Sequence, residues 1–90
     1  MVRNTVTKQE IELGLRDIEQ MLSRRLSKHG WSAFSSPHEA LGVIHEEDFE
    51  LVEAIKSNIR DHISDEMMDV AVAALFAYIC NRYTNPRCEQ

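Results

Sequence analysis

Acidic residues occur at two places in the sequence as pairs with the same spacing. Glu47 and Glu50 form one pair, and Glu66 and Asp69 form the other. Residues three apart lie on adjacent turns of a helix, so each pair presents two carboxylates on one side. Carboxylate oxygens are preferred ligands of hard divalent cations, and Mg²⁺ is commonly held by a few carboxylates together with substrate phosphates. The two pairs predict a Mg²⁺ site, at which Mn²⁺ can substitute.

A helical projection, at about 100° per residue, places both pairs beside apolar residues. Glu47 falls inside the apolar arc of its segment and Glu50 at the edge of that arc, while Glu66 and Asp69 share a face with small residues such as Ala73. Carboxylates that face a core are costly unless a cation compensates them. Few basic residues stand at compatible positions, which favours a divalent cation. The alternative is an ordinary solvated helix face.

The first pair belongs to an EExxE motif that begins at Glu46, and the second pair ends an ExxD motif. Together the motifs resemble the signature of the MazG-like nucleotide pyrophosphohydrolases, which are all-α nucleoside triphosphate pyrophosphatases. The resemblance covers about half of the chain, from Pro37 to Ile79. We therefore expect the fold and the chemistry of that family.

The resemblance implies a Mg²⁺-dependent hydrolase that cleaves a nucleoside triphosphate between its α- and β-phosphates, giving a monophosphate and pyrophosphate. It implies that Glu47, Glu50, Glu66 and Asp69 are the metal ligands. It also implies a catalytic role for Glu46 beside the ligands, and either Glu46 or Glu47 is suited to accept a proton. The alternative is an inactive helical oligomer that binds metal or nucleotide in a structural or regulatory role.

Two further residues are candidates for substrate binding. Lys56 lies nearly two helical turns beyond Glu50 and is a candidate phosphate contact, with a solvated lysine as the alternative. Trp31 lies in a loop together with Phe34, where an aromatic ring can stack on a nucleobase or cover a core. His45 adjoins the acidic motif and is assigned no metal.

Three helices are expected to position these residues. Thr7 and Glu10 form a capping-box pattern, which predicts a first helix from about Lys8 to Lys28 that ends at Gly30. The pattern Ser36-Pro37 with Glu39 is a second capping box and predicts a helix from about Pro37 to Ser57. These two starts are the strongest local signals in the sequence.

The third helix is expected to begin at a cap provided by Asp61 or Ser64 and to continue to about Arg82, with Asn85-Pro86 closing the ordered chain. Short connections between helices predict antiparallel neighbours. We expect a single all-α domain over residues 1–90, an antiparallel helical bundle with flexible tails at 1–6 and 84–90.

Apolar residues outside the acidic faces, Phe49 and Met67 among them, exceed what three helices can bury. Association of identical chains into a homodimer or homotetramer is therefore expected to complete the bundle. A small core also gains most from such association.

Composition narrows the class of protein and its partners. The formal net charge of -5 argues against nonspecific binding of nucleic acid. The longest charge-free run, Val70 to Asn81, is too short to span a membrane. Cys80 and Cys88 lack the spacing of a metal finger and the N-terminus lacks a signal segment, so a cytoplasmic protein is expected.

Overall fold

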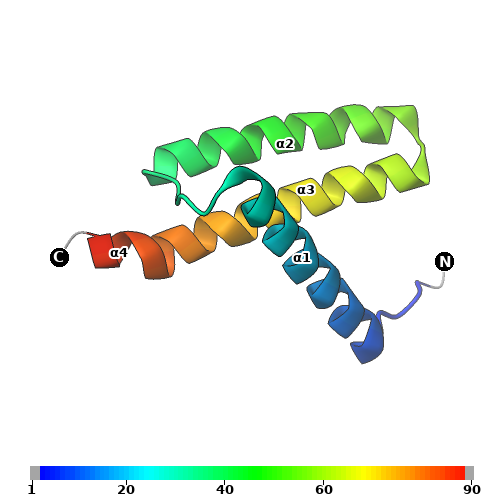
Figure 1. Ribbon diagram of the computed structural model, residues 1–90. Helices are drawn as coiled ribbons and strands as arrows, with labels where there is room; N and C mark the ends of the chain where they lie inside the picture. Colours follow the sequence, from blue (N-terminus) through cyan, green and yellow to red (C-terminus); the bar gives the residue numbers. More distant parts are fainter. Residues whose placement is uncertain (1–2, 89–90) are drawn as a thin grey trace. The chain divides into compact units, whose positions relative to one another are not determined.

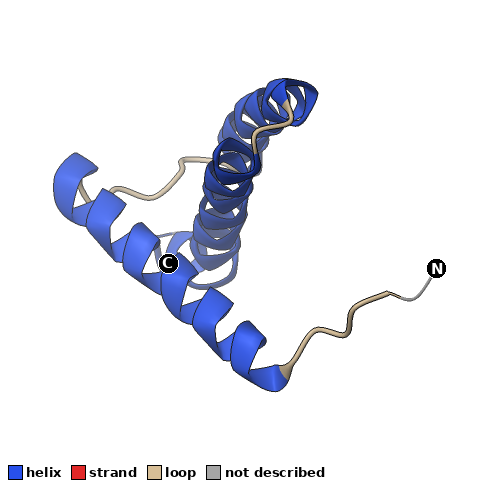
Figure 2. Cartoon of the chain, turned by 90° about the vertical axis from the view of Figure 1, so that its right-hand side faces the viewer, coloured by secondary structure: helices blue, strands red, loops and turns tan. Residues whose placement is uncertain are grey.

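The computed structural model describes residues 3–88, with side chains for residues 3–86. Residues 1, 2, 89 and 90 of the predicted tails lie outside this described part. The chain is helical between residues 8 and 88 apart from short connections (Figure 1), and no strand occurs within residues 3–88 (Figure 2). The expectation of an all-α fold is confirmed. Contacts divide the chain into two compact units, Met1–Gly30 and Trp31–Gln90.

The first unit consists of one helix, α1 (Lys8–His29), which ends one residue beyond the predicted end. The predicted capping box is complete: Glu10 N donates to Thr7 Oγ1 at 3.1 Å, and Thr7 N donates to Glu10 Oε1 at 2.8 Å. The hydrogen bond from Thr7 N also lowers the pKa of Glu10. Gly30 ends the helix at φ 101°, a conformation that favours glycine, and its N–H donates to the Leu26 carbonyl.

The second unit begins with a loop and α2 (Pro37–Ser57), whose bounds match the prediction. Glu39 N donates to Ser36 Oγ at 3.2 Å, which is one half of the predicted capping box. The other half is not formed, because the Glu39 carboxylate accepts from the hydroxyl of Ser35 at 2.9 Å and from its N–H instead. The helix ends at Asn58 in the left-handed conformation, with φ 56°.

The next helix, α3 (Arg60–Ile79), follows after one extended residue, Ile59. Ile59 provides no side-chain cap, so the prediction that Asp61 or Ser64 caps this helix is wrong. The left-handed Asn58 turns the chain within two residues, and the helix therefore resumes before either predicted cap. Asp61 lies in the first turn, where its negative charge interacts favourably with the helix dipole.

Helical structure extends further toward the C-terminus than predicted. The regular helix ends at Ile79 rather than near Arg82, and the π-helical segment η1 (Cys80–Thr84) leads into α4 (Asn85–Cys88). The prediction that Asn85-Pro86 closes the ordered chain is wrong. Pro86 is the second residue of α4, which follows η1 without a break, so helical structure continues through the proline.

Helices α2 and α3 lie side by side and run in opposite directions as a hairpin (Figure 1). The buried hydrophobic residues among those described are Ala40, Ala54, Val72, Ala73 and Cys80. None of them is larger than valine, and small side chains at a helix contact allow the two axes to approach closely. A larger bundle and an oligomer remain predictions.

An aromatic contact joins the loop before α2 to α3 in the second unit. Phe34, in the loop before α2, contacts Phe76 of α3 edge to face, with ring centroids 5.1 Å apart. Asn85 Nδ2 donates to the Phe34 carbonyl at 3.2 Å, which ties the loop to α4. This apolar part holds the start of α2 against the second half of α3.

Candidate metal centre

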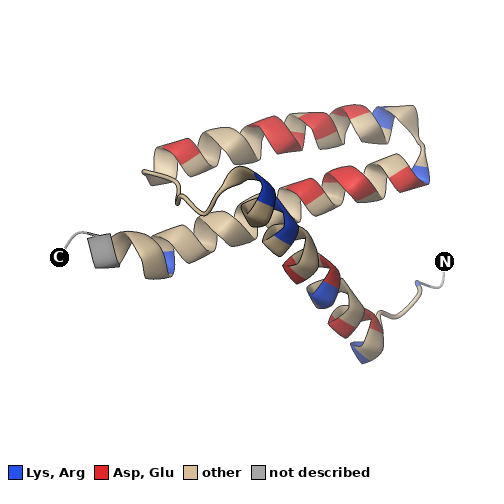
Figure 3. Ribbon diagram, viewed as in Figure 1, with Lys and Arg blue, Asp and Glu red and all other residues tan. Residues whose placement is uncertain are grey.

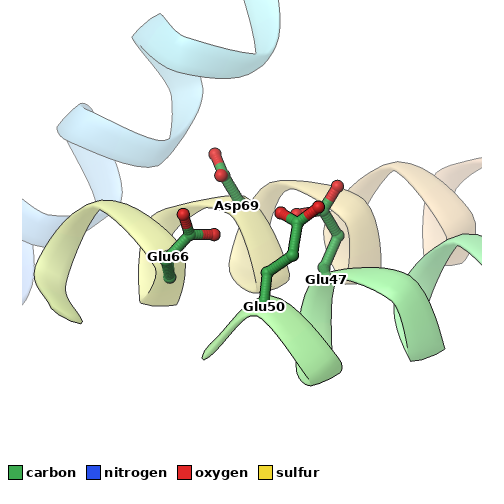
Figure 4. Close-up of side chains that lie close together, drawn as sticks. All are labelled: Glu47, Glu50, Glu66 and Asp69. Atoms are coloured by element: carbon green, nitrogen blue, oxygen red, sulfur yellow. The ribbon is translucent and has the colours of Figure 1, made fainter. Parts of the chain in front are cut away.

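The four predicted acids come together between α2 and α3. One carboxylate oxygen from each residue lies within 4.8 Å of the others. Figure 4 shows two of the carboxylates rising from α2 and two from α3. The four residues of this acidic cluster are Glu47, Glu50, Glu66 and Asp69. Their proximity agrees with the helical projection, and their role as metal ligands remains a prediction.

The hairpin explains this convergence. The connection of Asn58 and Ile59 sets the two helices in opposite directions, so the later half of α2 lies beside the first half of α3. Acidic residues occupy those two halves, whereas α3 carries no charged residue from Val70 to Ile79 (Figure 3). The three-residue spacing of each pair then brings both of its carboxylates toward the neighbouring helix.

Glu66 is the acid whose environment is most informative. Its side chain is only 16% exposed, and its Oε2 atom is buried with no hydrogen-bond partner among the described residues. Burial raises the pKa of Glu66, and the charges of Asp69 and Glu50 raise it further, while His62 acts in the opposite direction. A buried carboxylate oxygen beside other acids is an acceptor that a cation would satisfy.

The arrangement fits a hard divalent cation. All four donors are oxygen atoms, which suits Mg²⁺, Mn²⁺ or Ca²⁺ better than softer metals. Opposite ligands of a Mg²⁺ ion lie about 4 Å apart, because each Mg–O distance is about 2.1 Å. The 4.8 Å span of the cluster is close to this distance, so the four residues could hold one such ion.

Three other predicted site residues lie outside the cluster. Glu46 is exposed on α2, next to Glu47 in the sequence. Lys56 is 68% exposed and pairs with Glu53 at 3.3 Å. Trp31 is 72% exposed, so of the two loop aromatics Phe34 covers apolar residues and Trp31 does not. The roles of these three residues remain predictions.

One residue of the site was missed by the sequence reasoning. His62 Nε2 lies 3.5 Å from Glu66 Oε1, at the edge of the acidic cluster. The signal was present, since His62 and Glu66 are four residues apart on one helix and such residues are neighbours on its surface. The helical projection considered only the acids and the apolar residues around them.

Comparison of the chain with models of protein families, with curated proteins and with solved structures gives no match. The resemblance to the MazG-like pyrophosphohydrolases thus continues to depend on the two acidic motifs.

Proposed function

We propose that this chain is a Mg²⁺-dependent nucleotide pyrophosphohydrolase that cleaves a nucleoside triphosphate between the α- and β-phosphates. The observation that supports the proposal is the approach of four carboxylate oxygens, two from each helix, to within 4.8 Å. Like charges on neighbouring turns destabilise a helix, so a protein gains no stability from gathering them. Such a cluster is explained by a ligand of opposite charge.

The acidic cluster would hold the metal through all four of its residues. A bound divalent cation would supply positive charge against the phosphate oxygens and would acidify water at the site. Without it, the carboxylates repel a triphosphate. Nucleotide affinity should therefore require the metal.

Proton transfer is assigned to Glu46, with Glu47 as the alternative. Glu46 is exposed beside the cluster and is free to accept the proton of a water that attacks phosphorus. The new bond joins the water oxygen to phosphorus. The bond that breaks is the one between this phosphorus and the oxygen that bridges the α- and β-phosphates. The products are a nucleoside monophosphate and pyrophosphate.

Lys56 and Trp31 are assigned to the substrate. Lys56 would contact a phosphate after exchanging its ion pair with Glu53, which is weak because both side chains are more than half exposed. Trp31 presents an exposed ring that can stack on a base. These assignments would be tested by the KM for nucleotide in variants of the two residues, since neither residue takes part in bond breaking.

A second copy of the chain is proposed to cover the exposed apolar residues. Phe49 is 66% exposed on α2 and Met67 is 52% exposed on α3. Large apolar side chains in water favour association, and symmetric dimers are the commonest solution. A homodimer or homotetramer is the form in which we expect the protein to act.

The test is release of pyrophosphate from a panel of canonical and modified nucleoside triphosphates, with and without Mg²⁺. We expect Glu47→Gln and Asp69→Asn to lower the rate by about 100-fold or more, since even residues that only support metal ligands contribute about 10- to 100-fold. Asp48→Asn on α2 and Asp65→Asn on α3 are matched controls, because each removes one exposed acid next to the cluster.

Circular dichroism would verify that all four variants keep their helices. Metal-independent release, or equal rates in the cluster variants and the controls, would contradict the proposal. A different result favours the inactive metal-binding protein: Mg²⁺ raises the melting temperature and no nucleotide in the panel is turned over. The buried oxygen of Glu66 is the observation behind this second candidate, because a cation would satisfy it without any catalysis.

A further inference from the structure

His62 occupies the first turn of α3, one helical turn before Glu66. Its Nε2 atom lies 3.5 Å from Glu66 Oε1. The imidazole is 52% exposed, whereas the Glu66 side chain is 16% exposed. The contact therefore joins a partly exposed ring to a more buried carboxylate. The other oxygen of that carboxylate is the buried Oε2.

The crowding of carboxylates works against the position of Glu66. Carboxylate oxygens of Asp69 and Glu50 lie within 4.8 Å of one of its own, and like charges repel. A glutamate side chain has three rotatable bonds, and holding it in one arrangement costs conformational entropy. Rotation outward to water would relieve both the repulsion and the entropy cost. An attractive partner on the outer side works against that rotation.

We infer that His62 is a positioning residue, which holds Glu66 Oε1 so that the buried Oε2 remains available to a metal ion in the acidic cluster. The inference deepens the proposed function and rests on its metal site. It assigns His62 no contact with the metal or the nucleotide.

The chemistry of imidazole suits this role. Nε2 carries a proton in the charged ring and in one neutral tautomer, so it can donate toward Oε1 in either form. Metal-binding carboxylates are commonly hydrogen-bonded by a neighbouring group, which fixes their orientation and raises the affinity for the metal. A carboxylate held through one oxygen still presents the other to a cation.

The experiment measures the binding of Mn²⁺ alone to the full chain by electron paramagnetic resonance, which needs no nucleotide and no turnover. His62→Leu removes the donor, and His62→Ala repeats the removal with a smaller side chain. We expect the Kd for Mn²⁺ to rise by about tenfold in both variants. His38→Leu is the matched control, because His38 is an exposed histidine of α2 that precedes Glu47, the first acid of the cluster, by more than two helical turns.

His62→Gln distinguishes positioning from packing. The glutamine amide offers an N–H at a reach similar to that of Nε2, so this variant should recover most of the lost affinity, whereas a purely steric role would not be rescued. Two results would overturn the inference and leave the proposed function standing. One is wild-type affinity for Mn²⁺ in both His62→Leu and His62→Ala. The other is a loss of affinity in His62→Gln as large as that in His62→Leu. Absence of Mn²⁺ binding to the wild-type chain would overturn both.

Discussion

The second unit contains an apolar part, in which the contacts are favourable, and an acidic part, in which the charges repel one another. In the apolar part, Phe34 and Phe76 meet edge to face and Asn85 bonds the Phe34 carbonyl, so the contacts within the chain are favourable by themselves. In the acidic part, Glu66 lies beside other carboxylates. Its pKa is raised, and one of its oxygens is buried. One part stabilises the hairpin, and the other is opposed by its own charges.

The apolar part and the acidic part lie along one pair of helices. Side chains of the apolar part can be explained by burial alone. The acidic cluster is not explained by stability, because burial and the charges of Asp69 and Glu50 make the ionised form of Glu66 unfavourable in the metal-free protein. Its explanation requires something outside the chain, and a divalent cation has the matching charge and coordination chemistry.

The largest effect that separates the two parts is expected from Phe34→Ala. Removal of the ring should lower the free energy of unfolding by about 2 kcal/mol, less than for a fully buried phenylalanine because Phe34 is only partly buried. The affinity for Mn²⁺ should stay unchanged. Urea unfolding followed by circular dichroism gives the stability. A large loss of Mn²⁺ affinity in folded Phe34→Ala would mean that the two parts are not separable.

A smaller effect is expected from the pH dependence of the metal-free chain. The raised pKa of Glu66 means that the folded chain binds this proton more tightly than the unfolded chain does. Glu66 therefore does not lower the stability of the fold at a pH below its unfolded pKa, about 4.3. It destabilises the fold progressively as the pH rises through the higher folded pKa.

Glu66→Gln should remove this dependence. We expect the metal-free variant to be more stable than wild type at pH 7, with the difference shrinking toward pH 4. Urea unfolding at several pH values in the presence of a chelator measures it, and Asp65→Asn on the same helix is the control. A wild-type chain that is more stable than Glu66→Gln at neutral pH would contradict the assignment of Glu66 as a strained acid.

The helix starts show what local sequence can predict. The hydroxyls of Thr7 and Ser36 accept hydrogen bonds from N–H groups in the first turns of their helices, so the bounds follow from short motifs. The start of α3 has no such side chain, because Ile59 caps it through its backbone alone. No local motif was available to predict that start.

The C-terminal end of the helices was unpredictable for a related reason. The π-helical segment Cys80–Thr84 depends on backbone hydrogen bonds of a longer reach, for which side-chain types give no clear signal. Pro86 was interpreted as a terminator, but helical structure continues through it from η1 into α4. A proline is therefore not by itself evidence that a helix ends.

The candidate site was more predictable than the ends of the helices. Spacing within each acidic pair and the short connection of the hairpin are both visible in the sequence, and together they bring Glu47 and Glu50 to Glu66 and Asp69. His62 was missed although its position four residues before Glu66 is visible in the sequence, because only the acids and the apolar residues were placed on the helical projection.

We propose that the four acids jointly bind one divalent cation. Anomalous diffraction from crystals grown with Mn²⁺, recorded at the manganese absorption edge, can locate such an ion. We expect an anomalous peak between α2 and α3, in contact with oxygens of Glu47, Glu50, Glu66 and Asp69. Fully occupied manganese elsewhere, with these carboxylates turned into solvent and no peak among them, would contradict it.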